Sequence, residues 1–343
     1  MYAMKTKIKG RFAIIQISGI NWNIHEDAPE KYKLKFLPDF RFVNPYKFSK
    51  AYKNLMLLRN NPILINRSCQ LHTSGLILEY VGKDAKPQFE SIFEKISQFL
   101  KYLRFESRQT SINPSAGIYS IHFEGQLEKG LADDINQVDM MATHPRHYLT
   151  MVKWINVVNA DQKLSKEINL PVFEEMLLEA YSSWGNHEYN KVLLFSTIAT
   201  ESLLAHTYDK IYEIEKTKAR PKNTLRMAKG AMGHVKDPIW KALMDRTDFK
   251  KLLHEAPLYL INKSILLENE ALYKDLIKLY NTRNKIVHLG APVVHSPDHF
   301  IELNSKGAFA ALKMAIAVFN WVGNFDYDFM VEEKFISLKE AVN

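Results

Sequence analysis

The residues best suited to chemistry lie near the C-terminal end of the chain, in the run Leu279–Gly290. Arg283 is followed directly by Asn284, and His288 comes after four intervening residues. An imidazole titrates near neutral pH and can move a proton. A guanidinium can hold a charged phosphate through two parallel hydrogen bonds. These residue types together fit proton transfer and the stabilisation of a developing negative charge.

A long helical pattern, Glu268–Leu289, carries these residues. Its apolar side chains recur at spacings of three or four, which forms one face of a helix. Arg283 interrupts that face, and a guanidinium there needs a partner unless it extends along its own stem to water. A second helical pattern, Tyr189–Ile214, carries Glu201 on its apolar face. Pairing would satisfy both side chains, and a solvated position for Glu201 is the alternative.

His288 lies in the last turn of its helix, because Gly290 and Pro292 stop the helical pattern directly afterwards. The negative end of the helix dipole favours a protonated imidazole at that place. His288 and Asn284 are four positions apart and therefore share one side of the helix. A simple capping role for His288 is the structural alternative to a chemical one.

Length and composition limit the class of protein. At 343 residues the chain has room for two domains. A single cysteine, Cys69, excludes an internal disulfide framework and favours a reducing compartment. The most apolar stretch, Ala308–Val322, is too short to span a membrane and carries Lys313. The N-terminal residues lack the apolar core of a secretory signal, so we expect a cytoplasmic protein without a membrane span.

Positive charge gathers at the N-terminal end. Residues 1–60 hold twelve Lys and Arg against four Asp and Glu, an excess of eight that equals the net charge of +8 for the whole chain. A basic surface attracts polyanions, nucleic acid above all. Lys31, Lys33 and Lys35 alternate with apolar residues, which is typical of a half-buried strand with lysines on its outer side. We consider them candidate RNA contacts, although an ordinary solvated surface would also explain the charge.

Residues 1–126 have the pattern of an α+β domain. Apolar runs at Arg11–Ser18, Leu76–Val81 and Ile118–Phe123 favour strands. Pro87–Phe105 has the periodicity of a strongly amphipathic helix. This half carries no Gly-rich phosphate loop, no Cys/His metal spacing and no nucleophile motif, so its fold class is all that the residues predict.

Residues 127–170 are expected to form a junction with a connecting helix at Tyr148–Val158. His144 and His147 are three positions apart within it, but no Cys or acidic residue accompanies them at a matching spacing. We therefore expect no metal site and no cofactor.

From Pro171 onwards the pattern is helical, and residues 171–325 contain four major helical stretches with short connections. Those stretches are Pro171–Tyr181, Tyr189–Ile214, Glu268–Leu289 and Lys306–Val322. Such an order predicts an up-down bundle, with the last helix buried because it is apolar almost all round. Residues 326–343 are expected to be a tail. The whole chain thus reads as an α+β N-terminal domain followed by an all-α up-down helical bundle.

Two runs of the helical half together resemble a known family. The first is Ala180–Leu204, with Gly185, Tyr189 and the segment Ala-Thr-Glu-Ser-Leu-Leu, and the second is Leu279–Gly290. They resemble a HEPN domain, most closely its Apea-like branch, whose hallmark is Arg, four to six residues and then His. The likeness covers about residues 171–325, and the N-terminal domain resembles no family that we recognise.

The resemblance implies metal-independent RNA cleavage of the toxin or defence type. Active HEPN proteins are usually dimers in which the motif helices of two protomers face each other, so RNA and a second copy are the expected partners, with a possible neutralising or triggering protein. Arg283, His288 and Asn284 take the catalytic positions, and Glu201 takes a supporting one. The expected products are a 2′,3′-cyclic phosphate and a 5′-hydroxyl.

Two alternatives stay open at this point. The helical half can be a non-catalytic HEPN module that binds nucleotide, RNA or a protein partner, because a fold does not give a function. In the other alternative, the basic α+β domain does the work and the bundle serves for dimerisation.

Overall fold

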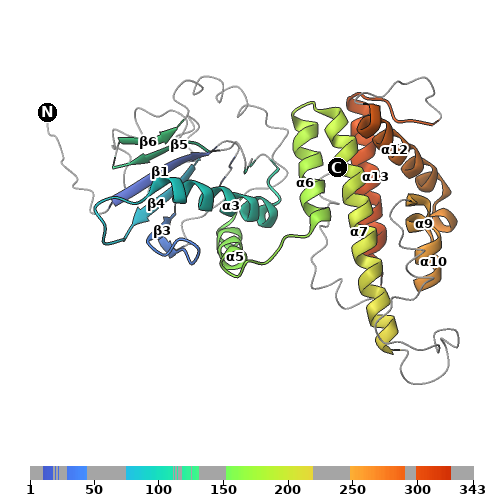
Figure 1. Ribbon diagram of the computed structural model, residues 1–343, viewed down its shortest axis with the longest axis horizontal. Coiled ribbons are helices and arrows are strands. Elements are labelled where there is room, and N and C mark those ends of the chain that lie inside the picture. Colours follow the sequence, from blue (N-terminus) through green and yellow to red (C-terminus); the bar gives the residue numbers. More distant parts are fainter. Residues whose placement is uncertain are drawn as a thin grey trace. The chain divides into compact units, whose positions relative to one another are not determined.

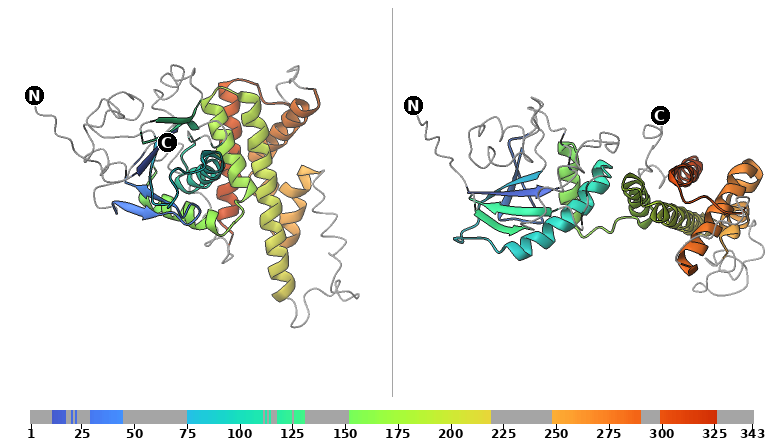
Figure 2. Two further views of the ribbon diagram at one scale, coloured as in Figure 1. Left: turned by 60° about the vertical axis from the view of Figure 1, so that its left-hand side comes forward. Right: turned by 90° about the horizontal axis from the view of Figure 1, so that it is seen from above.

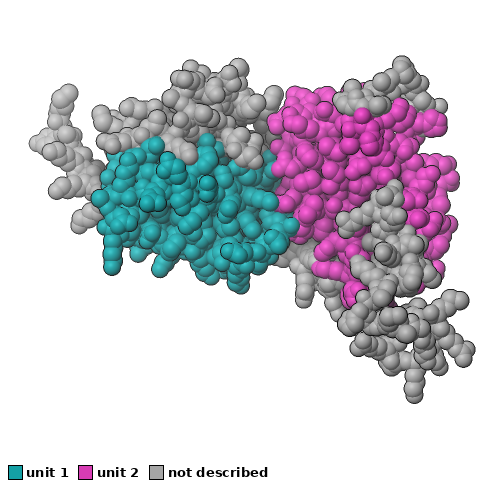
Figure 3. All heavy atoms as spheres, viewed as in Figure 1, with its two compact units in different colours: residues 1–170 teal, residues 171–343 magenta. Residues whose placement is uncertain are grey.

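The computed structural model describes residues 11–17, 20, 22, 29–44, 75–110, 112, 114, 118–124, 126–130, 152–218, 248–289 and 299–325. The chain divides into two compact units, residues 1–170 and residues 171–343 (Figure 3). The first unit is mixed α and β, and the second is mostly helical. The second unit starts at Pro171, which is also where the sequence pattern turns helical.

Unit 1 is built on an antiparallel sheet with the strand order β2-β3-β4-β1-β5-β6 (Figure 1). The strands are β1 (Arg11–Ile17), β2 (Lys31–Lys33), β3 (Phe40–Val43), β4 (Gly75–Tyr80), β5 (Ile118–Phe123) and β6 (Gln126–Gly130). The register aligns Phe42, Leu78, Ala13 and Phe123 in one row across four strands. All four are buried, so one face of the sheet forms a continuous apolar surface.

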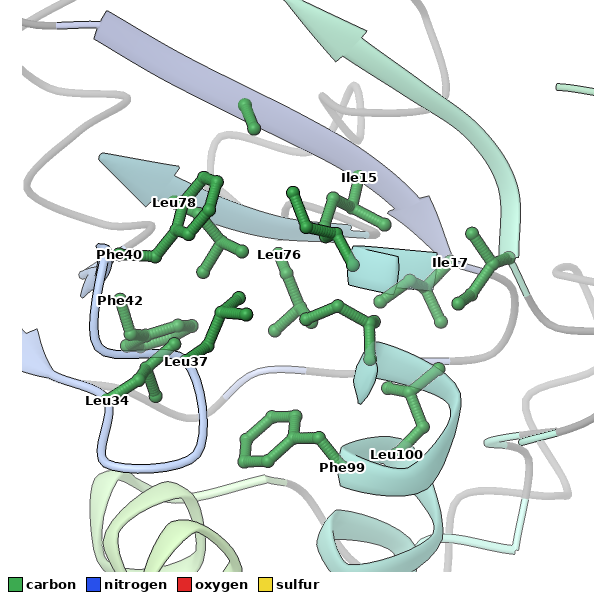
Figure 4. Packing of buried hydrophobic residues seen from close by; sticks show 14 of the residues in the cluster. Ile15, Ile17, Leu34, Leu37, Phe40, Phe42, Leu76, Leu78, Phe99 and Leu100 are labelled. Carbon is green, nitrogen blue, oxygen red and sulfur yellow. The ribbon is translucent and has the colours of Figure 1, made fainter. Parts of the chain in front are cut away.

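Two helices cover that face, α3 (Phe89–Ser107) and α5 (Trp154–Ser165), as Figures 1 and 2 show. The amphipathic stripe of α3 supplies Phe99 and Leu100, which lie on the side of the sheet where Leu76 and Leu78 project (Figure 4). All four are at most 1% exposed. Burying a side chain of this size contributes roughly 1.5–3 kcal/mol, so the stripe of α3 is a main source of stability for unit 1.

The strand predicted from the lysine alternation is shorter than expected. β2 ends at Lys33, and the chain then turns through residues 34–39 before β3 begins. The backbone N–H groups of Lys35 and Phe36 donate to the carboxylate of Asp161 in α5, at 2.7 and 3.1 Å. Those donors are therefore held by a side chain instead of a neighbouring strand, which ends the ladder.

The first compact unit extends beyond residue 126, the predicted limit of the first domain. β6 begins at Gln126 and pairs with β5, and α5 packs against α3. Residues 152–165 therefore belong to the core of unit 1 and do not form a separate junction. The connecting helix starts at Trp154, whereas we predicted Tyr148, because Lys153 is still extended.

Unit 2 consists of helices around one long central helix, α7 (Tyr189–Lys218), as Figure 1 shows. The others are α6 (Val172–Gly185), α9 (Phe249–Leu253), α10 (Glu255–Ile261), α11 (Ile265–Glu268), α12 (Glu270–Leu289) and α13 (Ser305–Gly323). α6, α12 and α13 all pack against α7. α7 continues beyond its predicted end at Ile214 to Lys218, and its surface contacts each of these three helices.

The helix that bears the Arg-to-His motif starts later than predicted. α11 ends at Glu268, and Asn269 separates it from α12. The Asn269 side chain accepts a hydrogen bond from the N–H of Leu272 at 3.0 Å, which caps the first turn of α12. α13 buries one stripe, whereas Phe309 and Trp321 on its other side stay partly exposed, so it is less enclosed than its composition suggested.

Candidate functional site

Arg283 lies on the side of α12 that faces α7. Its Nη2 atom is 3.7 Å from Oε2 of Glu201, and the two side chains are 27% and 21% exposed. That distance is longer than a hydrogen bond, so the contact is an electrostatic one in a half-buried setting. The two charged residues that interrupt the apolar faces of two helices thus lie against each other.

Asn284 holds the guanidinium from the other direction. Nη1 of Arg283 donates to Oδ1 of Asn284 at 2.8 Å. The ring of Tyr280 is 6.0 Å from the guanidinium carbon and stacks on Phe249 with 4.9 Å between ring centres. The Nε atom of Arg283 is buried and donates to no acceptor in the described part of the chain. The guanidinium is therefore oriented by neighbours while most of its five N–H donors are not taken up by hydrogen bonds within these residues.

His288 occupies a different side of the same helix end. It lies five positions after Arg283, which turns the two side chains by roughly 140° about the helix axis. His288 is exposed, and its ring makes no hydrogen bond or ion pair among the described residues. The structure thus brings Arg283, Asn284 and Glu201 together in one chain and leaves His288 facing outward, close to Asn284 along the helix.

A pair of contacts beside the motif was not predicted from the sequence. The N–H of Ile301 donates to Oγ1 of Thr282 at 2.8 Å, and the Thr282 side chain is completely buried. Nζ of Lys285 lies 3.6 Å from the centre of the Phe300 ring. These contacts attach residues 300–301 to the last turns of α12. A threonine on the buried side of a helix was the available signal, because its hydroxyl has to find a partner.

The three lysines proposed for RNA contact differ in their surroundings. Nζ of Lys31 pairs with Oε1 of Glu79 at 2.9 Å, so its charge is used within unit 1. Lys33 and Lys35 are exposed. Only the last two therefore remain candidates for an outside polyanion.

No group of three or more His, Cys, Asp and Glu side chains that would suit a metal ion occurs among the residues described here. His144, His147 and Cys69 lie outside the described residues. In the same described ranges, no helix combines the length and apolar character that crossing a membrane requires.

A groove of about 700 Å³ lies between the start of α6 and the middle of α7, all within unit 2. It was not predicted from the sequence, although His206, Asp209, Lys210 and Glu213 recur on one side of α7. The ring of His206 packs on Phe173, 5.3 Å between centres. Burial lowers the pKa of His206, and the charge of Lys210 lowers it further, while Asp209 acts in the opposite direction.

Compared with known proteins, the chain matches no protein-family model, no curated protein and no solved structure.

Proposed function

We propose that this protein is a metal-independent RNA endonuclease of the HEPN type, with a site made by the α12 helices of two copies. The observation that carries the proposal is the oriented guanidinium of Arg283, held by Asn284 and Glu201, on the same helix end as the exposed His288. The helical half would then be an up-down bundle of the kind that the motif resemblance implies.

The chemistry follows from these two groups. A neutral imidazole removes the proton from the ribose 2′-hydroxyl, O2′ attacks phosphorus, and the bond from phosphorus to O5′ breaks. A water molecule delivers a proton to O5′, and the imidazolium then returns the proton that it took to the solvent. The guanidinium of Arg283 stabilises the negative charge that develops on the phosphoryl oxygens. The products are a 2′,3′-cyclic phosphate and a 5′-hydroxyl, and no water is consumed.

A second copy is needed because Arg283 and His288 face different sides of α12 within one chain. A two-fold axis beside this helix end would bring the guanidinium of one copy near the imidazole of the other. Val287 lies between Arg283 and His288 around the helix and is 53% exposed. An exposed apolar side chain at this place fits a surface that a second copy covers.

The first test measures cleavage of a labelled RNA by the purified protein in the presence of EDTA. Cleavage should persist with EDTA, and His288→Ala and Arg283→Ala should each lower the rate by about 10²–10⁴-fold, because each removes a group that acts on the reacting atoms. His187→Asn is the matched control, since His187 is exposed and lies outside the motif. Activity that depends on a divalent metal, or that survives in His288→Ala, would contradict the mechanism.

Mixing the two inactive variants tests the composite site. A dimer with one Arg283→Ala chain and one His288→Ala chain keeps one intact pair if the two groups come from different copies. Cleavage should therefore return on mixing. If the variants stay inactive in a verified mixed dimer, each site is formed within a single chain.

The alternative is a non-catalytic module that binds nucleotide, RNA or a protein. The groove along α6 and α7 favours it, because that groove exists within one copy and lies apart from the motif on the chain. RNA binding without any cleavage by the wild-type protein would support this alternative.

A further inference from the structure

The contact between Lys285 and Phe300 lies beside the proposed catalytic imidazole. Lys285 is three residues before His288 in α12, so the two side chains share one side of the helix. Its Nζ atom is 3.6 Å from the centre of the Phe300 ring, and both residues are partly exposed. A cation and an aromatic face are thus presented together, next to His288.

The ring is held in that place by the backbone. Ile301, the next residue, donates its N–H to the buried Thr282 hydroxyl at 2.8 Å, and Thr282 in turn donates to the carbonyl of Lys278 at 2.7 Å. Thr282 is 0% exposed and Ile301 is 8% exposed. A short buried anchor therefore fixes the position of Phe300 relative to α12 before any ligand arrives.

We propose that Lys285 and Phe300 form a nucleotide subsite for single-stranded RNA, flanking the cleavage position. The ammonium of Lys285 contacts a phosphate, and a base stacks on the face of the Phe300 ring that Lys285 does not cover. Stacking needs an unpaired, accessible base face, which a nucleotide inside a duplex does not offer. This inference rests on the proposed function and adds a preference for unpaired RNA to it.

Binding is measured by fluorescence anisotropy with the full-length His288→Ala protein, which keeps the RNA intact. The probes are a labelled single-stranded oligoribonucleotide and its duplex. Phe300→Leu should weaken binding of the single strand about tenfold, while Phe300→Trp retains it, because stacking tolerates any aromatic face. Lys285→Met should lower the slope of log affinity against log salt by about 0.7, the value for one phosphate contact on a single strand.

Lys274→Met is the matched control for Lys285→Met. Lys274 lies on α12, pairs with Glu270 at 2.8 Å and is 66% exposed, and it lies eleven positions before Lys285. It should leave the affinity and the salt slope unchanged. Unchanged binding in Phe300→Leu, equal loss in Phe300→Trp and Phe300→Leu, or a duplex that binds as well as the single strand would each overturn the subsite.

Cleavage separates the two proposals. If the wild-type protein cuts single-stranded RNA but the Phe300 and Lys285 variants keep its KM and kcat, the subsite fails and the nuclease stands. If the wild-type protein cuts no RNA, the proposed function fails first.

Discussion

Asp161 is a buried carboxylate whose contacts organise the turn that follows β2. It lies in α5 with 0% exposure and accepts three hydrogen bonds, from the hydroxyl of Tyr32 and from two backbone N–H groups, those of Lys35 and Phe36. Burial raises the pKa of the Tyr32 phenol, and the hydrogen bond to Asp161 and the charge of that carboxylate raise it further. One carboxylate therefore joins α5 to the end of β2 and fixes the turn that follows.

The first prediction concerns this carboxylate. Asp161→Ala should lower the free energy of unfolding by about 3–5 kcal/mol, because two backbone donors and a hydroxyl lose their acceptor. Asp161→Asn should cost less, since the amide oxygen still accepts from the backbone. Tyr32→Phe should cost about 1 kcal/mol, because it removes one of the three bonds. Urea unfolding measures the order, and a Tyr32→Phe loss that equals the Asp161→Ala loss would contradict it.

The sequence revealed some polar residues of this kind and not others. Arg283 and Glu201 each interrupt a regular apolar stripe, and a charge in such a stripe raises the question of a partner. Asp161 also lies on an apolar stripe, four residues after Val157 and three before Leu164, but the predicted helix ended at Val158 and the interruption was missed. Two of its three partners are backbone groups of a turn 125 and 126 residues earlier. Residues so far apart in the sequence come together only in the tertiary fold, and no local sequence pattern predicts that contact.

At the scale of elements, α7 contributes residues to two polar features of unit 2. Glu201 on one part of its surface meets Arg283 of α12, and His206 one turn and a residue later lines the groove beside α6. The ring of His206 is packed on Phe173 and lies near Asp209 and Lys210. The imidazole of His206 therefore lies in a partly apolar environment within the groove.

That position predicts a pH dependence of stability. The pKa of His206 is lower in the folded chain than its ordinary value of 6.5, first because of burial and then because of Lys210. The unfolded chain then binds the proton more readily, so the free energy of unfolding should fall as the pH drops below about 6.5 towards the folded value. His206→Gln should flatten this fall between about pH 7 and pH 5.

Urea unfolding at a series of pH values measures the effect. His187→Asn is the control, because that histidine is exposed and lies outside the groove. Parallel curves for His206→Gln and the wild type would show that the groove does not disfavour the charged imidazole.

Elements with a strong local period were predictable, and those that depend on pairing were not. The stripe of α3 predicted Pro87–Phe105, and the helix runs from Phe89 to Ser107. β3 and β6 were not predicted. β3 has only four residues, one of which is the exposed Arg41, and β6 contains a single large apolar residue. Both exist because a neighbouring strand offers them a hydrogen-bonding edge, which depends on residues distant in sequence.

For the whole molecule, the net charge overstates how many basic side chains are available to bind a polyanion. The excess of eight positive charges in residues 1–60 equals that of the whole chain. Within the sheet, however, Lys31 and Arg41 both lie near the carboxylate of Glu79, at 2.9 and 3.9 Å. Glu79 is only 8% exposed, so part of the positive charge serves to compensate it.

The last prediction separates these two uses of charge. If unit 1 holds the RNA backbone, replacing the exposed Lys33 and Lys35 by Gln in the His288→Ala protein should lower the salt slope of RNA affinity by about 0.7 for each lysine that contacts a phosphate. Lys31→Gln should instead lower the free energy of unfolding by about 1–3 kcal/mol, because Glu79 loses its hydrogen-bonded cation. Anisotropy over a salt series and urea unfolding give the two readouts. An unchanged salt slope in the Lys33 and Lys35 variant would show that neither lysine contacts an RNA phosphate.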